Sequence, residues 1–236
     1  MAFTSTVSGG PVFRGERVVS TNHQKAWDGS EWYTNAFLGV YDWFALGLHC
    51  CFFWGCSSKR ILDLYNQHVS GNHLDVGVGT GYFLDKCRFP AEIPRLVLVD
   101  LNPRSLDIAT KRLARYRPET YCRDVLQPLD IGGPKFDSIS ITHLLHCLPG
   151  DMDSKGAVFP NLKSLLNPGG ILFGCTFLYD AEYRSLRASA MFSLANRMGF
   201  MSNKHDDLAG LSRHLENHFS ECSIETSGCE ALFRAR

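Results

Sequence analysis

The stretch HLDVGVGTGYF, residues 73–83, predicts a buried strand that runs into a glycine-rich turn, with a helix beginning on the far side. Gly77, Gly79 and Gly81 occupy alternate positions of this turn. Glycine has no Cβ, so it adopts a positive φ easily and lets a ligand lie against the backbone. The first N–H groups of the following helix have no partner inside the helix. The pattern therefore indicates a cofactor-binding loop.

Two common nucleotide-binding loops do not fit this turn. The nicotinamide dinucleotide fingerprint G-x-G-x-x-G is excluded because Tyr82 occupies the place of its last glycine. A phosphate-binding P-loop is excluded because no Gly-Lys-Ser/Thr follows. The cofactor is therefore expected to be of another kind.

A second apolar strand, Arg95–Asp100, ends in a carboxylate 23 residues after Gly77, about one βαβ crossover later. At this position a carboxylate can accept hydrogen bonds from both hydroxyls of a ribose. Asp100 could instead cap the next helix, but Asn102 and Pro103 suit that purpose better, as N-cap and first helical residue. Asp100 is therefore expected to be free for a ligand.

Several segments resemble, in order, the motifs of class I S-adenosylmethionine-dependent methyltransferases. The segments are LDVGVGTG, LVLVDLNPRSLDIATKRL, CRDVLQPL, FDSISITHLLHCLP and LLNPGGILFGCTFL, between about residues 60 and 178. The resemblance implies an α/β Rossmann-like fold with a seven-stranded, mostly parallel sheet, an antiparallel last strand and an N-terminal helical lid. It also implies S-adenosyl-L-methionine as cofactor and S-adenosyl-L-homocysteine as product. Within the family, the chain is similar to small stand-alone enzymes of fungal and bacterial secondary metabolism.

The same resemblance implies which residues hold the cofactor. Asp124 would accept a hydrogen bond from the adenine amino group and the amide of Val125 would meet the ring, unless Asp124 only caps the turn before Pro128. Tyr41 would reach the methionine end. The full set of expected cofactor contacts is Tyr41, Asp75, Gly77, Gly79, Gly81, Asp100, Leu101, Asp124, Val125 and His143.

Two histidines follow the predicted fourth strand, Phe136–Ile141, in the segment THLLHCLP. Ligands of open α/β sheets gather at the carboxyl ends of strands, and an imidazole with its usual pKa near ~6.5 can take a proton at neutral pH. His143 and His146 are therefore the catalytic candidates, His143 as the cofactor-side contact and His146 as the substrate-facing group. Either ring could instead satisfy backbone groups at a helix start.

Composition limits the partners. The 236 residues carry 24 basic and 24 acidic side chains, so no basic field exists to hold a nucleic acid. The N-terminus has no charged region followed by an apolar run, which predicts a cytoplasmic protein without a secretory signal. Most of the nine cysteines are expected to be small buried hydrophobes. Cys50, Cys51 and Cys56 lack a second pair at zinc spacing, so no metal site is expected.

The chain is predicted to divide into a flexible arm (residues 1–25), a helical lid (26–70) and the S-adenosylmethionine-binding domain (71–236). Glu31–Cys56 is long and apolar enough to resemble a membrane span, but Asp42 lies near its middle and glycines interrupt it. Helices over the cofactor mouth, with Tyr41 inward, are the favoured interpretation. Further helices are expected over Ser57–Val69, Pro103–Tyr116, Phe159–Leu166, 180–201 and from the cap at Asp206-Asp207 to Phe219, and a hairpin over Cys222–Phe233.

These expectations converge on S-adenosylmethionine-dependent methylation of a small metabolite, with an aromatic hydroxyl or a carboxylic acid as the leading acceptor. Two alternatives stay open on the sequence. The fold could bind the cofactor for a reaction other than methyl transfer, such as a pericyclic one. It could also be a non-catalytic binding subunit. The oligomeric state, monomer or homodimer, is open as well.

Overall fold

A computed structural model describes residues 55–181 and 184–236 of the chain. Tyr41, the predicted arm and most of the predicted lid lie outside these residues, so the division of the chain into arm, lid and domain stays a prediction. No helix within residues 55–181 and 184–236 is long and apolar enough to cross a membrane.

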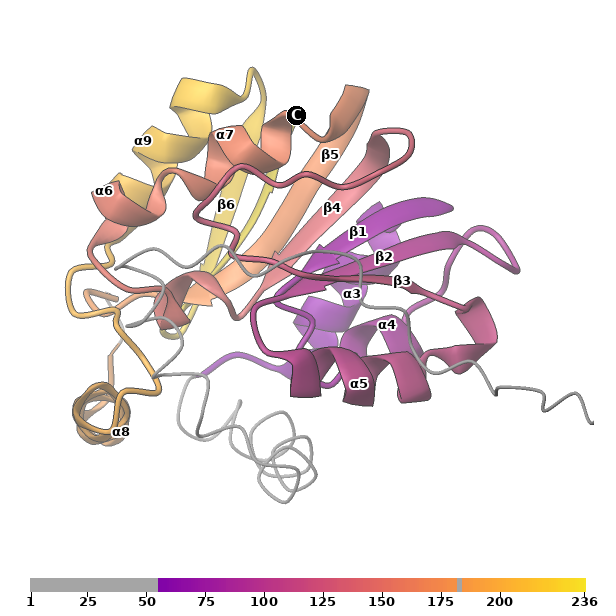
Figure 1. Cartoon of the computed structure of the whole chain (residues 1–236). Helices are drawn as coiled ribbons and strands as arrows, with labels where there is room; N and C mark the ends of the chain where they lie inside the picture. The colour runs from indigo at the N-terminus through magenta and orange to yellow at the C-terminus, as the bar shows by residue number, and fades with distance from the viewer. Residues whose placement is uncertain (1–54, 182–183) are drawn as a thin grey trace, which may run out of the picture.

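A seven-stranded sheet forms the centre of the described part, in the order β3-β2-β1-β4-β5-β7-β6 (Figure 1). Strands β1 to β5 run parallel to their neighbours, whereas β7 is antiparallel to both β5 and β6. The strands are β1 (Asn72–Val76), β2 (Arg95–Asp100), β3 (Glu119–Cys122), β4 (Phe136–Thr142), β5 (Leu166–Phe177), β6 (Cys222–Ser227) and β7 (Glu230–Ala235). The predicted sheet, with its antiparallel last strand, is confirmed.

Helices cover both faces of the sheet (Figure 1). One face carries α3 (Ser58–His68), α4 (Tyr82–Lys86) and α5 (Pro103–Arg112), and the other carries α6 (Met152–Lys155), α7 (Val158–Lys163) and α9 (Leu208–His218). The sheet is apolar on both sides, as parallel sheets are. In β2, Leu96 and Leu98 belong to one hydrophobic core and Val97 and Val99 to the other. The remaining helix, α8 (Leu186–Arg197), packs against the carboxyl end of β5, where its Phe192 joins Phe177 and Cys229 in a third, smaller core.

Side-chain caps fix where several helices begin. The Ser57 side chain accepts a hydrogen bond from the N–H of Lys59 at the start of α3. Asn102 accepts one from the N–H of Arg104, with Pro103 as the first residue of α5. Asp207 caps α9 through the N–H of Gly210. The predicted N-cap at Asn102 is confirmed, and of the expected pair Asp206-Asp207 it is Asp207 that caps α9. Each of the three caps satisfies a backbone donor that the helix itself leaves unpaired.

The structure differs from the expected boundaries in several places. The helix expected over Phe159–Leu166 spans Val158–Lys163, and among the described residues of the helix expected over 180–201 only Leu186–Arg197 are α-helical. The helix expected over Pro103–Tyr116 ends at Arg112 and continues as a 3₁₀ turn over Ala114–Tyr116. The expected turn at residues 167–170 lies inside β5, because Phe136 pairs with Leu166 and Ser138 with Ile171, which leaves four residues bulged out of the register. The Asn-Pro-Gly-Gly pattern predicts the turn, but it does not reveal that Leu166, before the turn, already pairs with β4.

Asp206 does not cap α9 but forms a buried ion pair with Lys155, the last residue of α6. Both side chains are fully buried. The Lys155 Nζ donates to Asp206 Oδ2 at 2.6 Å, to Oδ1 at 2.8 Å and to the carbonyl of Ser202 at 2.7 Å. Every donor of the ammonium thus has an acceptor, which holds the loop before α9 against the domain.

Candidate functional site

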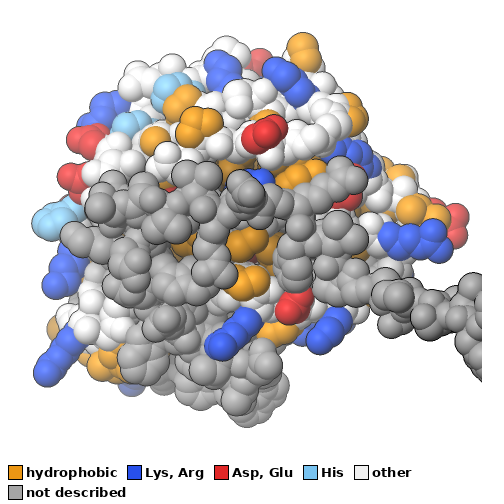
Figure 2. All heavy atoms as spheres, viewed as in Figure 1, with side chains coloured by type: hydrophobic (Ala, Val, Ile, Leu, Met, Phe, Trp, Pro, Cys, Tyr) orange, Lys and Arg blue, Asp and Glu red, His pale blue; other side chains and the backbone are white. Residues whose placement is uncertain are grey.

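A cavity opens at the carboxyl ends of β1, β2, β3 and β4. The strand order changes direction between β1 and β4, and ligands of open α/β sheets bind at such points. The walls are Tyr65, Asp75–Phe83, Val99–Asn102, Ser105, Arg123–Val125, Thr142–Leu144, Cys147, Leu148, Gly199 and Phe200. In the view of Figure 2, hydrophobic side chains gather near the middle of the face, and charges of both signs are scattered around them.

The glycine turn forms one wall of this cavity. Gly77, Gly79 and Gly81 all have positive φ, at 74°, 54° and 73°. A Cβ on Gly77 would lie 2.8 Å from the Leu144 side chain, so the turn and the segment after β4 touch closely. A Cβ on Gly79 would meet no atom of residues 55–181 and 184–236 within 4 Å. Among these residues, the backbone at Gly79 therefore faces open space, as close approach of a ligand requires.

Asp75 and Asp100 place two buried carboxylates beside the turn. Asp100, at the end of β2, accepts hydrogen bonds from the N–H of Asn102 at 2.8 Å and from that of Gly79 at 3.3 Å. Asp75 accepts from Ser140 Oγ at 2.6 Å and from the Tyr65 hydroxyl at 3.3 Å. Burial raises the pKa of Asp75 to about 7 and that of Asp100 to about 6, because it disfavours the charged form.

Asp124 and Val125, which follow β3, also line the cavity. The Asp124 side chain is 6% exposed, and its Oδ1 accepts a hydrogen bond from the N–H of Leu126 at 2.9 Å. It therefore caps the turn, as the alternative interpretation expected, while it also forms part of the cavity wall. Leu101 lies on the same wall. The structure thus brings together every expected cofactor contact except Tyr41, which lies outside the described residues.

His143 lines the cavity directly after β4. Its φ is 56°, a conformation that is uncommon outside glycine, although histidine adopts it more often than most residues, and that recurs at functional sites. The ring stacks on Phe177 with centroids 5.0 Å apart and planes 13° apart. Nε2 lies 2.5 Å from Oε1 of Glu230, a buried glutamate at the start of β7. The imidazole is thus held on two sides and borders the cavity.

His146 is not among the residues that line the cavity. It is 3% exposed, and its Nδ1 accepts a hydrogen bond from the N–H of Phe177 at 3.3 Å. Burial, with smaller effects from His143 and Lys155, lowers the pKa of His146 well below its usual value, so the ring is neutral. Its catalytic role stays a prediction, and the described geometry favours a supporting position behind His143.

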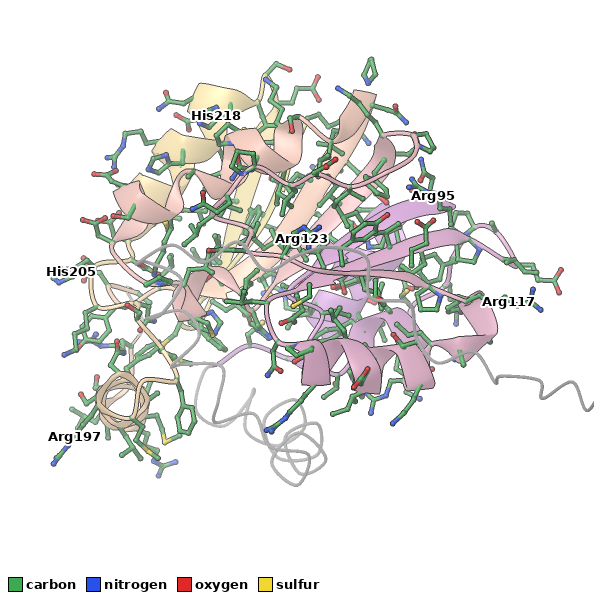
Figure 3. The ribbon with its side chains drawn as sticks, viewed as in Figure 1. Arg95, Arg117, Arg123, Arg197, His205 and His218 are labelled. Carbon is green, nitrogen blue, oxygen red and sulfur yellow. The ribbon has the colours of Figure 1, made fainter. Side chains whose placement is uncertain are left out.

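Several cavity residues were not expected from the sequence. Tyr65 lies in the expected helix Ser57–Val69, was not among the expected site residues, and donates its hydroxyl to Asp75. Arg123 lies near the middle of the molecule at the end of β3, whereas Arg197 and His205 lie at its periphery (Figure 3). Glu230, which lies outside the cavity lining but beside His143, carried one signal in the sequence, a charge directly before the apolar run Ala231–Phe233.

The chain is similar to known methyltransferases in sequence and in fold. Residues 74–172 match the family described as "Methyltransferase domain". Demethylluteothin O-methyltransferase of Streptomyces thioluteus is 34% identical over 219 residues, 92% of this chain and 95% of that protein. The physcion biosynthesis cluster O-methyltransferase of Aspergillus chevalieri is 34% identical over 205 residues, 86% and 92% of the two chains. A solved S-adenosylmethionine-dependent methyltransferase from Clostridium acetobutylicum has a TM-score of 0.58 at 16% identity, covering 86% of this chain and 98% of that one.

The two O-methyltransferases match this chain over almost their full lengths, so the relationship covers the whole domain and not only the cofactor turn. The fold of the solved structure agrees with it. Together with the glycine turn and the carboxylate at the end of β2, these matches show that the chain belongs to the class I S-adenosylmethionine-dependent methyltransferases, as an enzyme of the type that acts on small metabolites.

Proposed function

We propose that this enzyme transfers the methyl group to an oxygen of a small metabolite, either a carboxylic acid or an aromatic hydroxyl. The observation that carries this proposal is the position of His143, an imidazole on the cavity wall at the carboxyl end of β4. The names of two relatives, both O-methyltransferases, support an oxygen acceptor.

The residues that line the cavity are suited to bind S-adenosylmethionine. Gly77, Gly79 and Gly81 would let the cofactor lie against the backbone, where the space beside Gly79 is open. Asp100 would accept hydrogen bonds from the ribose hydroxyls and Asp75 would lie at the methionine end. Asp124 and the amide of Val125 would meet the adenine ring, with Leu101 beside it and His143 near the transferred group. Tyr41 remains a proposed contact outside the described residues.

When bound, the cofactor supplies a methyl group on a positively charged sulfur, which is already electrophilic. The protein then has to hold the acceptor oxygen in line and keep water out, because most of the acceleration comes from orientation. A hydroxyl acceptor also needs a base, and His143 is the proposed base. A carboxylate acceptor is already charged and needs only to be oriented and partly neutralised.

The proposal is tested by incubating the full chain with S-adenosylmethionine labelled in the methyl group and pooled acceptors. One pool would contain hydroxy-aromatic compounds, a second carboxylic acids and a third amines. Labelled ester or ether products from the first two pools would support it. Transfer only to amines would refute the choice of oxygen while leaving the methyltransferase activity in place.

S-Adenosylhomocysteine should raise the melting temperature of the protein, whereas NAD and NADP should not. Tyr82 occupies the position where a dinucleotide loop needs its last glycine. At a concentration near 100 times Kd, a ligand that binds only the folded state should shift the transition by about 5–10 °C for a domain of this size. Thermal unfolding followed by fluorescence measures the shift. Stabilisation by NAD and not by S-adenosylhomocysteine would overturn the proposed cofactor site.

Asp100→Ala should weaken the binding of S-adenosylhomocysteine by about 1.5–3 kcal/mol, the range for a lost hydrogen bond to a charged group. The pKa of Asp100 is about 6, so the ionised acceptor is present at pH 8 and is lost as the pH falls below 6. Wild-type affinity should therefore weaken by up to about tenfold per pH unit below 6. Titration calorimetry at pH 8 and pH 5 measures both effects.

The exposed Asp130 offers a matched control, because it does not line the cavity. Asp130→Ala should keep the wild-type affinity and its pH dependence. An unchanged affinity in Asp100→Ala would mean that this carboxylate only supports the backbone amides of Gly79 and Asn102.

A further inference from the structure

A carboxylate and an imidazole form a close pair at the edge of the sheet where the cavity opens. The Glu230 Oε1 lies 2.5 Å from Nε2 of His143, and the two side chains are 0% and 12% exposed. The ring of His143 borders the cavity, whereas Glu230 lies behind it, outside the cavity lining. Glu230 therefore can act on a bound acceptor only through His143.

The direction of β7 explains how a distant glutamate reaches this position. Because β7 is antiparallel to β5, its first residue lies beside the last residue of β5, so Glu230 is paired with Phe177. The carboxyl ends of the parallel strands and the beginning of β7 thus meet at one edge. The N–H of His143 donates to the carbonyl of Cys175, the β5 residue two positions before Phe177. The backbones that carry the pair are therefore fixed to the same strand.

The groups around Glu230 keep its carboxylate ionised, and in the described part of the chain none of the other titratable groups beside it is charged. Burial alone would raise the pKa of Glu230, but His143 and nearby hydrogen-bond donors hold that pKa below its usual value. The other titratable groups that face the pair are the thiols of Cys56 and Cys175 and the His146 ring. Burial and Glu230 raise the pKa of both thiols, so they stay neutral, and His146 is neutral as well.

The hydrogen bonds of the pair determine where the proton of a neutral His143 ring lies. An ionised carboxylate only accepts hydrogen bonds, so Nε2 must carry the hydrogen that it gives to Glu230. Nδ1 then bears a lone pair, and in residues 55–181 and 184–236 it has no hydrogen-bond partner. The second oxygen of Glu230, Oε2, is buried without a hydrogen-bond partner in the same residues.

We propose that Glu230 is a positioning residue that holds His143 in the Nε2–H form, so that Nδ1 takes the proton of a hydroxyl acceptor. This inference rests on the proposed function. The acceptor oxygen gives its proton to Nδ1 and forms the bond to the methyl carbon. The bond between that carbon and sulfur breaks, and its electron pair stays on sulfur in the neutral S-adenosylhomocysteine. The positive charge that appears on His143 is balanced by the Glu230 carboxylate.

Glu230→Gln tests the proposal, because an amide has nearly the same shape but no charge and can donate as well as accept. The ¹⁵N chemical shifts of the His143 ring in the full chain, saturated with S-adenosylhomocysteine, report which nitrogen carries the hydrogen. Wild type should show the hydrogen on Nε2 alone, and Glu230→Gln should show a mixture of both forms. With a hydroxyl acceptor found in the labelled pools, kcat should fall by about 10²-fold, the lower end of what general acid–base catalysis contributes.

Two further variants separate charge and position from a general loss of structure. Glu230→Asp keeps the charge and should keep the hydrogen on Nε2 and recover part of kcat. Glu225→Gln changes the neighbouring strand β6, where Glu225 forms an exposed ion pair with Arg60, and should change neither measurement. If Glu230→Gln does not fold, the wild-type ring spectrum and Glu230→Asp decide the matter. A wild-type hydrogen on Nδ1 would overturn the proposal.

Three further outcomes would contradict the inference. Unchanged ring shifts and kcat in Glu230→Gln, with kcat lowered in His143→Ala, would overturn the role of Glu230 and leave the proposed function standing. Unchanged kcat in His143→Ala would overturn both. Stoichiometric zinc in the purified protein would also overturn it, because His143, Cys175 and Glu230 offer ligand atoms within 4.8 Å of one another and a metal would replace the hydrogen on Nε2.

Discussion

His143→Ala should lower kcat for a hydroxyl acceptor by about 10²–10⁴-fold, the contribution expected of a positioned general base. The imidazole is the proposed proton acceptor on the cavity wall. The Michaelis constant for the cofactor should change much less, because Asp100 and the glycine turn supply most of its proposed contacts. Steady-state kinetics with the labelled methyl donor measures both constants, and thermal unfolding checks that the variant is folded.

Comparing hydroxyl with carboxylate acceptors shows whether His143 acts as a base or only orients the acceptor. A carboxylate acceptor has no proton to give up, so His143→Ala should reduce its kcat by less than that of a hydroxyl acceptor. Equal losses for both classes would show that the ring orients the acceptor and does not take a proton. His205 is exposed and lies at the periphery of the molecule (Figure 3), so His205→Ala should match wild type with either acceptor.

Lys155→Met should lower the free energy of unfolding by about 3–5 kcal/mol, because it leaves the buried carboxylate of Asp206 without its cation. The loss should reach the site, since the loop that this pair holds also contributes Gly199 and Phe200 to the cavity. Urea denaturation followed by circular dichroism measures the change. The exposed Lys204→Met is the matched control and should be close to wild type.

The pH dependence of Lys155→Met has a definite sign. Burial raises the pKa of Asp206 to about 6 even with Lys155 opposite, and loss of the ammonium raises it further. The folded variant then binds a proton more tightly than the unfolded chain does, so a lower pH favours the folded state. The deficit relative to wild type should be largest near pH 8 and shrink toward pH 5. Replacing both partners by apolar residues should recover most of the stability. A loss independent of pH would indicate that packing, and not charge, is responsible.

The sequence predicted the parts of the site that short segments encode. The turn around Gly79 and the carboxylate of Asp100 each follow directly from a strand, and the cap at Asn102 follows from its local preference for helix starts. The apolar strand Arg95–Asp100 was likewise predicted from its own residues. Each of these features involves residues whose relative positions the backbone of one βαβ unit determines, and that explains why they could be predicted.

The two charge pairs could not be predicted, because each joins residues far apart in the chain. His143 and Glu230 are 87 residues apart, and Lys155 and Asp206 are 51 apart. Only the completed sheet brings them together. Asp206 was therefore interpreted as a helix cap, the local role open to an aspartate before a helix.

The roles of the two histidines show the same limit on a smaller scale. Their spacing in THLLHCLP suggested two rings at one helix start. In the structure, the backbone at His143 is left-handed and Leu145–Cys147 form a 3₁₀ turn, and the two rings lie edge to face with centroids 5.8 Å apart but in different surroundings. His143 borders the cavity, whereas His146 lies behind Phe177. The spacing of the two histidines did not predict the left-handed backbone at His143 or that only this ring borders the cavity.

The reversed direction of β7 also has a consequence for how the enzyme is made. On the ribosome, His143 emerges 87 residues before Glu230, which corresponds to about 4–17 s at ordinary elongation rates. The cofactor turn and β1 to β5 are synthesised before β7, so the imidazole stays without its carboxylate until the last strand has been made. The pair is therefore among the last contacts that the growing chain can form.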